Sequence, residues 1–327
     1  MRPAFLILAD SVNITALIAD RLIDLVITDK SGVKSDRLEI TVDDRDQRLE
    51  IPSTGARLEV SIGYQGRSLA RMGSYVADGV EISGPTRMMS INATAADMTG
   101  SIKAPKERSF HGITLLDLVK TIAADNGLEP AVSPSLAGRM IPHIDQTESD
   151  MQLLTRICAD LGGVCKVADG RLIVADHASG ETTGGASGQP KRLPLVPLDV
   201  GDCGSWSVTI ADRGRYASVV AYWQNTEAAE RVEVRAGAGD PSMALKQTYA
   251  TEEDAQAAAN SKYRALSRAT GTIRISGIVG DTSIAAEREL LLSGFRAGID
   301  GAGWVITSVV HRISKSGYTC SLEAERK

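Results

Sequence analysis

The chain has 327 residues, which is long enough for two or three domains with cores of their own. Its composition, 43% hydrophobic and 24% charged, excludes wholesale disorder, and its net charge of −5 excludes the overall basic field that non-specific nucleic-acid binding needs. The four cysteines lack CxxC spacing, which favours buried free thiols over a zinc site or a disulfide framework: Cys158, Cys165, Cys203 and Cys320.

The first residues contain short apolar bursts that Asp10, Asp20 and Arg21 interrupt. They lack the charged-then-apolar order and the small-residue cleavage site of a signal peptide. No apolar run approaches the ~18 residues of a membrane span. We therefore expect a protein that is made and folded in the cytoplasm and does not bind membranes by itself.

Residues 1–104 are expected to form an N-terminal β domain. Segments such as 37–42 and 57–62 alternate polar and apolar residues, which is typical of sheets with one wet face. Turn-forming residues separate these segments, for example at 83–86.

Residues 105–178 change to a pattern of helices with clear end signals. Thr114 and Asp117 predict a capped helix that ends at Gly127, and Ser149 with Gln152 predicts a capping box for a second helix. Because helices alternate here with strand-like segments, the block is expected to be a small α+β domain.

The end of this block contains Asp169-Gly170 between apolar residues, a sequence that predicts a β-hairpin. The following residues, 179–201, are rich in Gly, Ser, Thr and Pro, which is typical of a linker or an exposed loop. A domain boundary is therefore expected there.

Residues 202–327 are expected to form a C-terminal β domain with one helix. Strands are predicted at 206–210, at 218–223 and from 271 onward, with a helix capped by Thr251 and Asp254 between them.

The two β domains have similar residues at several positions that lie 231 residues apart in the chain. The matches are Gly63-Tyr64 on Gly294-Phe295, Ile82-Ser83 on Ile313-Ser314, and Ser90-Ile91-Asn92-Ala93 on Ser321-Leu322-Glu323-Ala324. Self-similarity at a fixed offset indicates a duplicated β domain.

Three stretches together resemble the late control protein D family of contractile-tailed phages, whose members are baseplate hub proteins. They are residues 109–128, residues 143–154 with Asp145-Gln146 and Glu148-Ser149-Asp150, and residues 250–318 with the alanine-rich helix, Trp304-Val305-Ile306, His311 and Gly317-Tyr318. Met151 and Leu153 depart from the family pattern, which often has an aromatic residue there.

The resemblance implies a mainly β fold with two related β-barrel-like tube domains that flank a small α+β domain. It also implies a homotrimer around a channel, whose six β domains imitate six-fold symmetry and join a hexameric tail tube to a trimeric spike. The implied partners are the tail spike, tail tube, baseplate wedge and tape measure proteins, in the baseplate of a virion or of a headless tailocin. Specific nucleic-acid binding and cofactors are not implied.

The sequence contains no recognisable catalytic constellation. The histidines lie far apart and none belongs to an HExxH motif: His111, His143, His177 and His311. The acidic run Asp43-Asp44-Arg45-Asp46 lacks the glycine and distal glutamate of a calcium loop. Carboxylate pairs such as Asp117 with Glu148, or Glu252 with Glu253, have no separation that the sequence fixes, and helix capping explains Asp117. We therefore expect no catalytic, metal or cofactor site.

The only tryptophans each lie in a predicted strand: Trp206, Trp223 and Trp304. Core packing is the ordinary role for such residues, and anchoring at a subunit interface is the functional alternative. Two other functions stay open beside the structural hub, namely a tail-associated cell-wall hydrolase and the spike base of a type VI secretion-like system.

Overall fold

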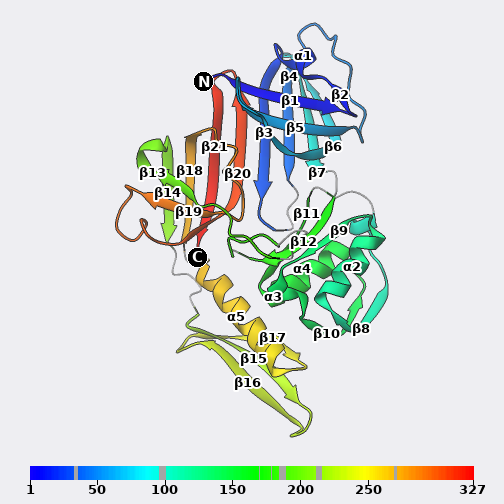
Figure 1. Ribbon diagram of the computed structural model, residues 1–327, viewed down its shortest axis with the longest axis vertical. Helices are drawn as coiled ribbons and strands as arrows, with labels where there is room; N and C mark the ends of the chain where they lie inside the picture. The colour runs from blue at the N-terminus through cyan, green and yellow to red at the C-terminus, as the bar shows by residue number, and fades with distance from the viewer. Residues whose placement is uncertain are drawn as a thin grey trace.

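The computed structural model describes residues 1–32, 36–95, 101–168, 170–177, 179–183, 189–210, 216–268 and 271–327. Within these ranges the chain is mainly β, with one long sheet and two smaller α+β units (Figure 1). Its buried hydrophobic side chains gather in three clusters, one for the long sheet and one for each unit. None of the helices in these ranges is long and apolar enough to cross a membrane.

The long sheet joins strands from both ends of the chain. Among the described residues its main path runs β14-β18-β21-β20-β3-β4-β7-β6-β5-β1-β2, with β19 beside β20 and β13 beside β19. The N-terminal elements are β1 (Pro3–Ala9), β2 (Val12–Asn13), α1 (Thr15–Ile18), β3 (Leu22–Lys30), β4 (Arg37–Asp43), β5 (Arg57–Tyr64), β6 (Ala70–Ser83) and β7 (Met88–Ala95). The C-terminal elements are β13 (Val196–Asp199), a 3-10 turn (Val200–Asp202), β14 (Ser205–Ile210), β18 (Gly271–Val279), β19 (Glu289–Ser293), β20 (Trp304–Ser314) and β21 (Gly317–Arg326).

Alternation of apolar and polar residues makes one face of this sheet the core. Along β4, Leu38 and Ile40 are buried whereas Arg37 and Glu39 are exposed. Successive side chains of a strand point to opposite faces, so the predicted alternation becomes a two-sided sheet. The strands predicted at 37–42 and 57–62 are thereby confirmed.

The two ends of the chain repeat one strand order. It is β3-β4-β7-β6-β5-β1 in the N-terminal half and β14-β18-β21-β20-β19-β13 in the C-terminal half, and strands at the same place also occur in the same order along the chain. Neighbouring strands are antiparallel in both halves, except that β13 is parallel to β19. The predicted duplication is confirmed, and the fold is that of two related β-barrel-like domains flanking a small α+β domain.

A bulge at the same place in both halves fixes which residues correspond. The pairings around it are Ala77–Ala93 then Gly79–Asn92 in β6–β7, and Ile306–Ala324 then Ser308–Glu323 in β20–β21. Residues of β7 and β21 therefore correspond at the predicted offset of 231, whereas Ala77 and Ile306 are 229 positions apart. The predicted match of Ile82-Ser83 with Ile313-Ser314 is two residues out of register, because the loops between the hairpin strands differ in length.

Strand β3 joins the two halves. It pairs with β4 of its own half on one side and with Ser308–Ser314 of β20 on the other. The register places Ile27 opposite His311 and Leu25 opposite Ile313, and all four side chains are buried. This joint within the chain gives both halves one continuous core.

The middle unit carries the helices predicted between residues 105 and 178. Its elements are a 3-10 turn (Ser101–Lys103), β8 (Arg108–Thr114), α2 (Leu115–Asp125), β9 (Glu129–Val132), α3 (Pro134–Ala137), β10 (Met140–Gln146), α4 (Asp150–Leu161), β11 (Gly163–Ala168) and β12 (Arg171–Asp176). Thr114 Oγ1 accepts from the Asp117 backbone N–H at 3.1 Å, and Ser149 forms the capping box with Gln152. The predicted hairpin is β11–β12, and Asp169 of its turn lies outside the described residues.

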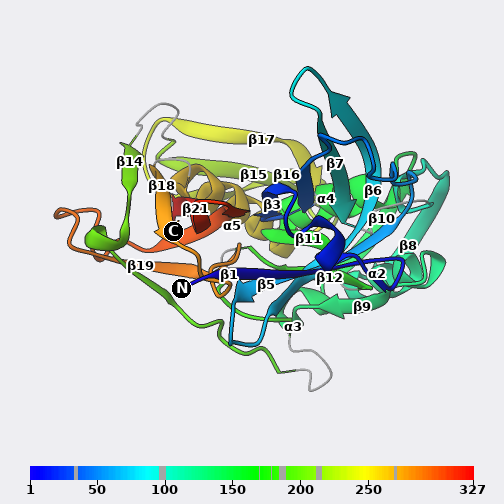
Figure 2. The same ribbon diagram turned by 90° about the horizontal axis from the view of Figure 1, so that it is seen from above.

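Residues 218–268 form a second unit, inserted between β14 and β18. It comprises β15 (Ser218–Asn225), β16 (Glu230–Gly237), β17 (Ser242–Tyr249) and α5 (Glu252–Arg268). The predicted cap of α5 is confirmed, since Thr251 Oγ1 accepts from the Asp254 backbone N–H at 3.2 Å. The helix packs on its own three-stranded sheet (Figure 2), with Ala255 and Ala259 buried against Val219. The sequence assigned this helix to the C-terminal β domain, whereas it has a core of its own.

The segment expected to be a linker contributes a strand to the core. Val196 and Leu198 of β13 are buried, and β13 pairs with β19. The Gly- and Pro-rich composition around β13 hides its short alternation. The boundaries at residues 104, 178 and 201 stay a prediction.

Candidate functional site

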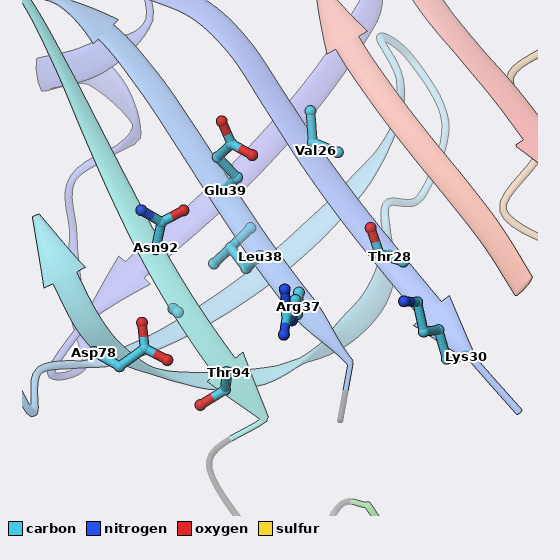
Figure 3. A pocket seen from close by; sticks show the side chains of 10 residues that line it. Val26, Thr28, Lys30, Arg37, Leu38, Glu39, Asp78, Asn92 and Thr94 are labelled. Carbon is cyan, nitrogen blue, oxygen red and sulfur yellow. The ribbon is translucent and has the colours of Figure 1, made fainter. Parts of the chain in front are cut away.

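The face of the long sheet opposite the core is polar. Lys30, Arg37, Glu39, Asp78 and Asn92 line an open hollow on this face, on strands β3, β4, β6 and β7 (Figure 3). Small-molecule sites are usually concave and mostly apolar, with a few convergent polar groups. The mixed charges spread across this hollow are instead those of a broad, wet sheet surface.

Cross-strand pairs extend this polar face over the joint into the second half. Arg312 of β20 bonds to Asp24 of β3 at 2.8 Å, and Arg274 of β18 bonds to Glu323 of β21 at 2.7 Å. Such exposed pairs contribute little to stability, about 0–1 kcal/mol each. These pairs neutralise part of the charge on this hydrophilic face.

The long sheet also has open edges. Strand β14 pairs with β18 on one side and with no described strand on the other. Strand β6 pairs with β7 as far as Ser83, but on its other flank β5 pairs with it only as far as Val76. Ile82 on β6 and Ile210 on β14 are 54% and 67% exposed. An edge strand with exposed apolar side chains is a template for pairing with another chain.

The three tryptophans occupy different environments. Trp304 is buried in the core of the long sheet, and its indole N–H donates to the Ile299 carbonyl at 3.1 Å, so core packing is its role and it has no surface for a partner. Trp223 packs in the cluster of the α5 unit. Trp206 on the open strand β14 is 42% exposed and makes an edge-on contact with Phe295, at 5.1 Å between ring centroids.

Three residues of the Asp-Gln and Glu-Ser-Asp motifs that carry the resemblance are buried and polar: Gln146, Ser149 and Asp150. The side chain of Asp150 is fully buried and accepts hydrogen bonds from Lys106 at 2.6 Å, Arg108 at 2.7 Å and Gln146 at 2.8 Å. Burial alone would raise the pKa of Asp150, but the hydrogen bonds from Gln146 and Lys106 hold it below its usual value. A carboxylate that is ionised and enclosed by donors fixes the start of α4 and has no free lone pair for catalysis.

Two histidines that are distant in sequence meet across β8 and β10. His111 and His143 are cross-strand partners whose Nδ1 atoms lie 2.9 Å apart, and His143 Nε2 lies 3.2 Å from Asp145 Oδ2. All three side chains are largely exposed. The contact of His143 with His111 could not be predicted from the sequence, because only the strand register creates it.

The other candidate groups serve local structure. His311 is buried and its Nδ1 lies 2.8 Å from the Tyr318 hydroxyl, while His177 Nδ1 lies 3.3 Å from Glu287. Burial lowers the pKa of His311. Glu148 binds Arg156 at 2.7 Å, as expected of a surface ion pair.

The acidic turn after β4 is held by an arginine. Asp46 makes a two-pronged ion pair with Arg21, at 2.6 and 2.7 Å. In the described part of the chain, no three His, Cys, Asp or Glu side chains gather in a way that could hold a metal ion.

Comparison with known proteins agrees with this architecture. The chain is 34% identical over 366 aligned residues to a probable baseplate hub protein of Escherichia phage P2, covering 99% of this chain and 93% of that protein. It is 33% identical to the corresponding protein of Escherichia phage 186, covering 100% and 94%.

Solved structures of tail proteins have the same fold. A 43 kDa tail protein of a prophage from Shewanella oneidensis superposes with a TM-score of 0.73 at 14% identity, covering 98% of both chains. A tail protein from Neisseria meningitidis gives 0.72 at 14% identity, covering 99% of this chain and 97% of that one. The profile of the phage tail baseplate hub (GPD) family matches residues 35–317, and this chain therefore belongs to that family of baseplate hub proteins.

Proposed function

We propose that three copies of this hub assemble around a three-fold axis and join a hexameric tail tube to a trimeric spike. The observation that carries this proposal is the repeat of one strand order in both halves of the chain. Three chains with two equivalent halves provide six equivalent sheets, which match a hexamer, while the units that occur once per chain match a trimer.

In this assembly the polar face of the long sheet lines the channel. A face with Lys30, Arg37, Glu39 and Asn92 stays wet, and the paired charges Arg312 and Asp24 limit its attraction for any one passing solute. The apolar face then packs outward as the core of each half. The hub is made in the host cytoplasm and acts by shape, not by catalysis, together with the tube, spike, wedge and tape measure proteins.

Trp206 is the proposed interface anchor among the three tryptophans. It is the one that lies exposed on an open strand, and large aromatic side chains often dominate the binding energy of interfaces. Trp223 stays a weaker candidate, because it is partly buried against the cluster of the α5 unit.

Light scattering on the purified chain, alone and with its spike protein, tests the proposed trimer. We expect a particle with the mass of three chains, at least in the presence of the spike. A chain that stays monomeric in both conditions at micromolar concentration contradicts the proposal. A peptidoglycan zymogram of the same material should show no lysis, which separates the hub from a tail-associated hydrolase.

A further inference from the structure

The repeat of the fold leaves one joint without its counterpart. Within the chain, β3 of the first half pairs with Ser308–Ser314 of β20 in the second half. The strand that corresponds to β3 is β14, and the strand that corresponds to β20 is β6. Both β14 and β6 have an open flank at the corresponding place, as far as the structure is described.

The open flanks expose side chains whose counterparts are buried. Ile82 of β6 corresponds to His311, since these residues lie opposite Met89 and Cys320, which correspond at the offset of 231. Ile82 is 54% exposed, whereas His311, covered by β3, is 1% exposed.

The same contrast holds on β14. Trp206 corresponds to Leu25. Trp206 lies opposite Ile275 of β18, and Leu25 lies opposite Ile40, the corresponding residue of β4. Trp206 is 42% exposed and Leu25 is 1% exposed. Each open flank therefore lacks the strand that covers its counterpart. Because β3 pairs with β20, the corresponding strands β14 and β6 could pair with each other in the same way.

We propose that β14 of one chain pairs antiparallel with residues 79–83 of β6 in the next chain, and thereby repeats between subunits the β3–β20 joint found within each subunit. This inference rests on the proposed trimer and specifies its contact. The register follows from the joint within the chain: Val80 opposite Ile210, Glu81 opposite Thr209, Ile82 opposite Val208, and Ser83 opposite Ser207.

The register is chemically consistent on both faces of the sheet. Val80 and Ile82 lie opposite the core residues Ile91 and Met89, so they are on the apolar side, where they meet Ile210 and Val208. Glu81 and Ser83 lie on the polar side, where they meet Thr209 and Ser207. A shift by one residue would place apolar side chains on the wet face, so the alternation selects this register.

Strand β13, and strand β1 beyond its short pairing with β2, also lie at edges of the two halves. They do not carry the same inference, because the described part of the chain contains no strand pairing between either of them and the opposite half. The β3–β20 pairing is the precedent that identifies a second copy of the chain as the occupant of β14 and β6.

Disulfide trapping with a matched pair of joints tests the register. In a Cys203→Ser background, Ser83→Cys with Ser207→Cys places two thiols across the proposed joint. Val26→Cys with Arg312→Cys places them at the corresponding positions of the joint within the chain, where Val26 and Arg312 are opposite. Directly opposite residues bring their Cβ atoms to about 4.5–5.5 Å, within reach of a disulfide after small adjustment.

Mild oxidation of the assembled hub should give covalent dimers and trimers from the Ser83→Cys with Ser207→Cys variant. The Val26→Cys with Arg312→Cys variant should give only an internally linked monomer. Each single variant, and the Ser83→Cys with Val208→Cys variant whose thiols point to opposite faces, should give at least about tenfold less covalent trimer.

A second variant tests the joint without disulfides. Ile82→Lys should leave the monomer folded, since the side chain is half exposed, and should reduce the trimer fraction by about tenfold because it buries a charge in the joint. Val208→Glu in the same chain should restore part of the assembly, since the two residues face each other between subunits.

The outcomes separate this inference from the proposed function. If light scattering shows a trimer and the Val26–Arg312 pair links, but the Ser83–Ser207 pair does not, the joint lies elsewhere and only this inference is overturned. If no trimer forms with or without the spike, the proposed function itself fails.

Discussion

A partly buried cluster of three charged side chains attaches the middle unit to the long sheet. Lys166 of β11 donates to Asp29 at 2.8 Å and to Asp36 at 3.0 Å, so two carboxylates share one ammonium group. Burial raises the pKa of Asp36 to about 6, and the neighbouring charge of Asp29 adds to this effect while Lys166 opposes it. The pKa of Asp29 is lowered instead: burial would raise it, but Lys166 and the Ala286 backbone N–H outweigh that effect.

This arrangement predicts a pH dependence of stability that belongs to Asp36. Its pKa is raised on folding, so its carboxyl favours the native state when protonated, and its contribution to stability falls as pH rises from about 4 to about 6. Asp36→Asn removes this dependence. The free energy of unfolding of the variant, relative to that of the natural chain, should be higher at pH 7 than at pH 4.5 by about 2 kcal/mol.

Urea unfolding at the two pH values measures this difference. The amide oxygen of Asn can still accept the hydrogen bonds from Lys166 Nζ and the Lys30 backbone N–H, so the comparison between pH values isolates the titration of the carboxyl. An equal effect of Asp36→Asn at both pH values would show that the carboxyl does not titrate between them.

Local signals in the sequence predicted residue roles well, and long-range pairings could not be predicted. The caps at Thr114 and Ser149 depend on neighbours three residues away, and both are confirmed. The contact of His111 with His143 depends on the β8–β10 register, which no local pattern specifies. The exposure of Ile82 likewise depends on where β5 stops pairing with β6.

At the scale of elements, replacing the tryptophan of β14 and replacing that of β20 by alanine should have different effects. Trp304 on β20 is enclosed by the core, so Trp304→Ala should destabilise the isolated chain by about 3–5 kcal/mol through cavity formation. Trp206 on β14 lies at an open edge, so Trp206→Ala should cost less than about 1 kcal/mol in the isolated chain. The same change should raise the concentration needed for half-maximal assembly by about tenfold.

Unfolding of the dilute chain and light scattering across a concentration series measure the two effects separately. Trp206→Phe is the conservative control and should keep part of the assembly. If Trp206→Ala destabilised the isolated chain as strongly as Trp304→Ala, Trp206 would be a core residue and not an anchor.

The sequence predicted most elements but not which layer each one joins. Alternation identified β4 and β5, and the cap at Thr251 identified α5. The packing of α5 on its own sheet could not be predicted, because its small apolar residues fit any flat surface. Strand β13 was hidden because four residues carry little alternation beside a Gly- and Pro-rich stretch.

At the scale of the whole molecule, the resemblance and the self-similarity predicted a duplicated β fold, and the structure adds how the two copies meet. The bulges after Ala77 and Ile306 show that the offset differs between the two strands of the hairpin. Shifting the chain by 231 residues without gaps therefore aligns β7 with β21 in the correct register. The same shift aligns β6 with β20 two residues out of register. Duplication was detectable from the sequence, whereas the equivalence of Ile82 with His311 needed the pairing of strands.

The proposed trimer makes a prediction about symmetry that a reconstruction can measure. Each chain contributes two equivalent halves of the long sheet but only one copy of each α+β unit. Density from the sheet halves should therefore show six-fold rotational symmetry, and density from α2, α4 and α5 only three-fold symmetry. Electron microscopy of the isolated hub, reconstructed with no more than three-fold symmetry imposed, provides both signals in one map. The matched control lies inside the particle, because the units and the sheets come from the same chains. A map in which the sheets also show only three-fold symmetry would mean that the two halves occupy non-equivalent places, and the match to a hexameric tube would then need another explanation than the repeat of strand order.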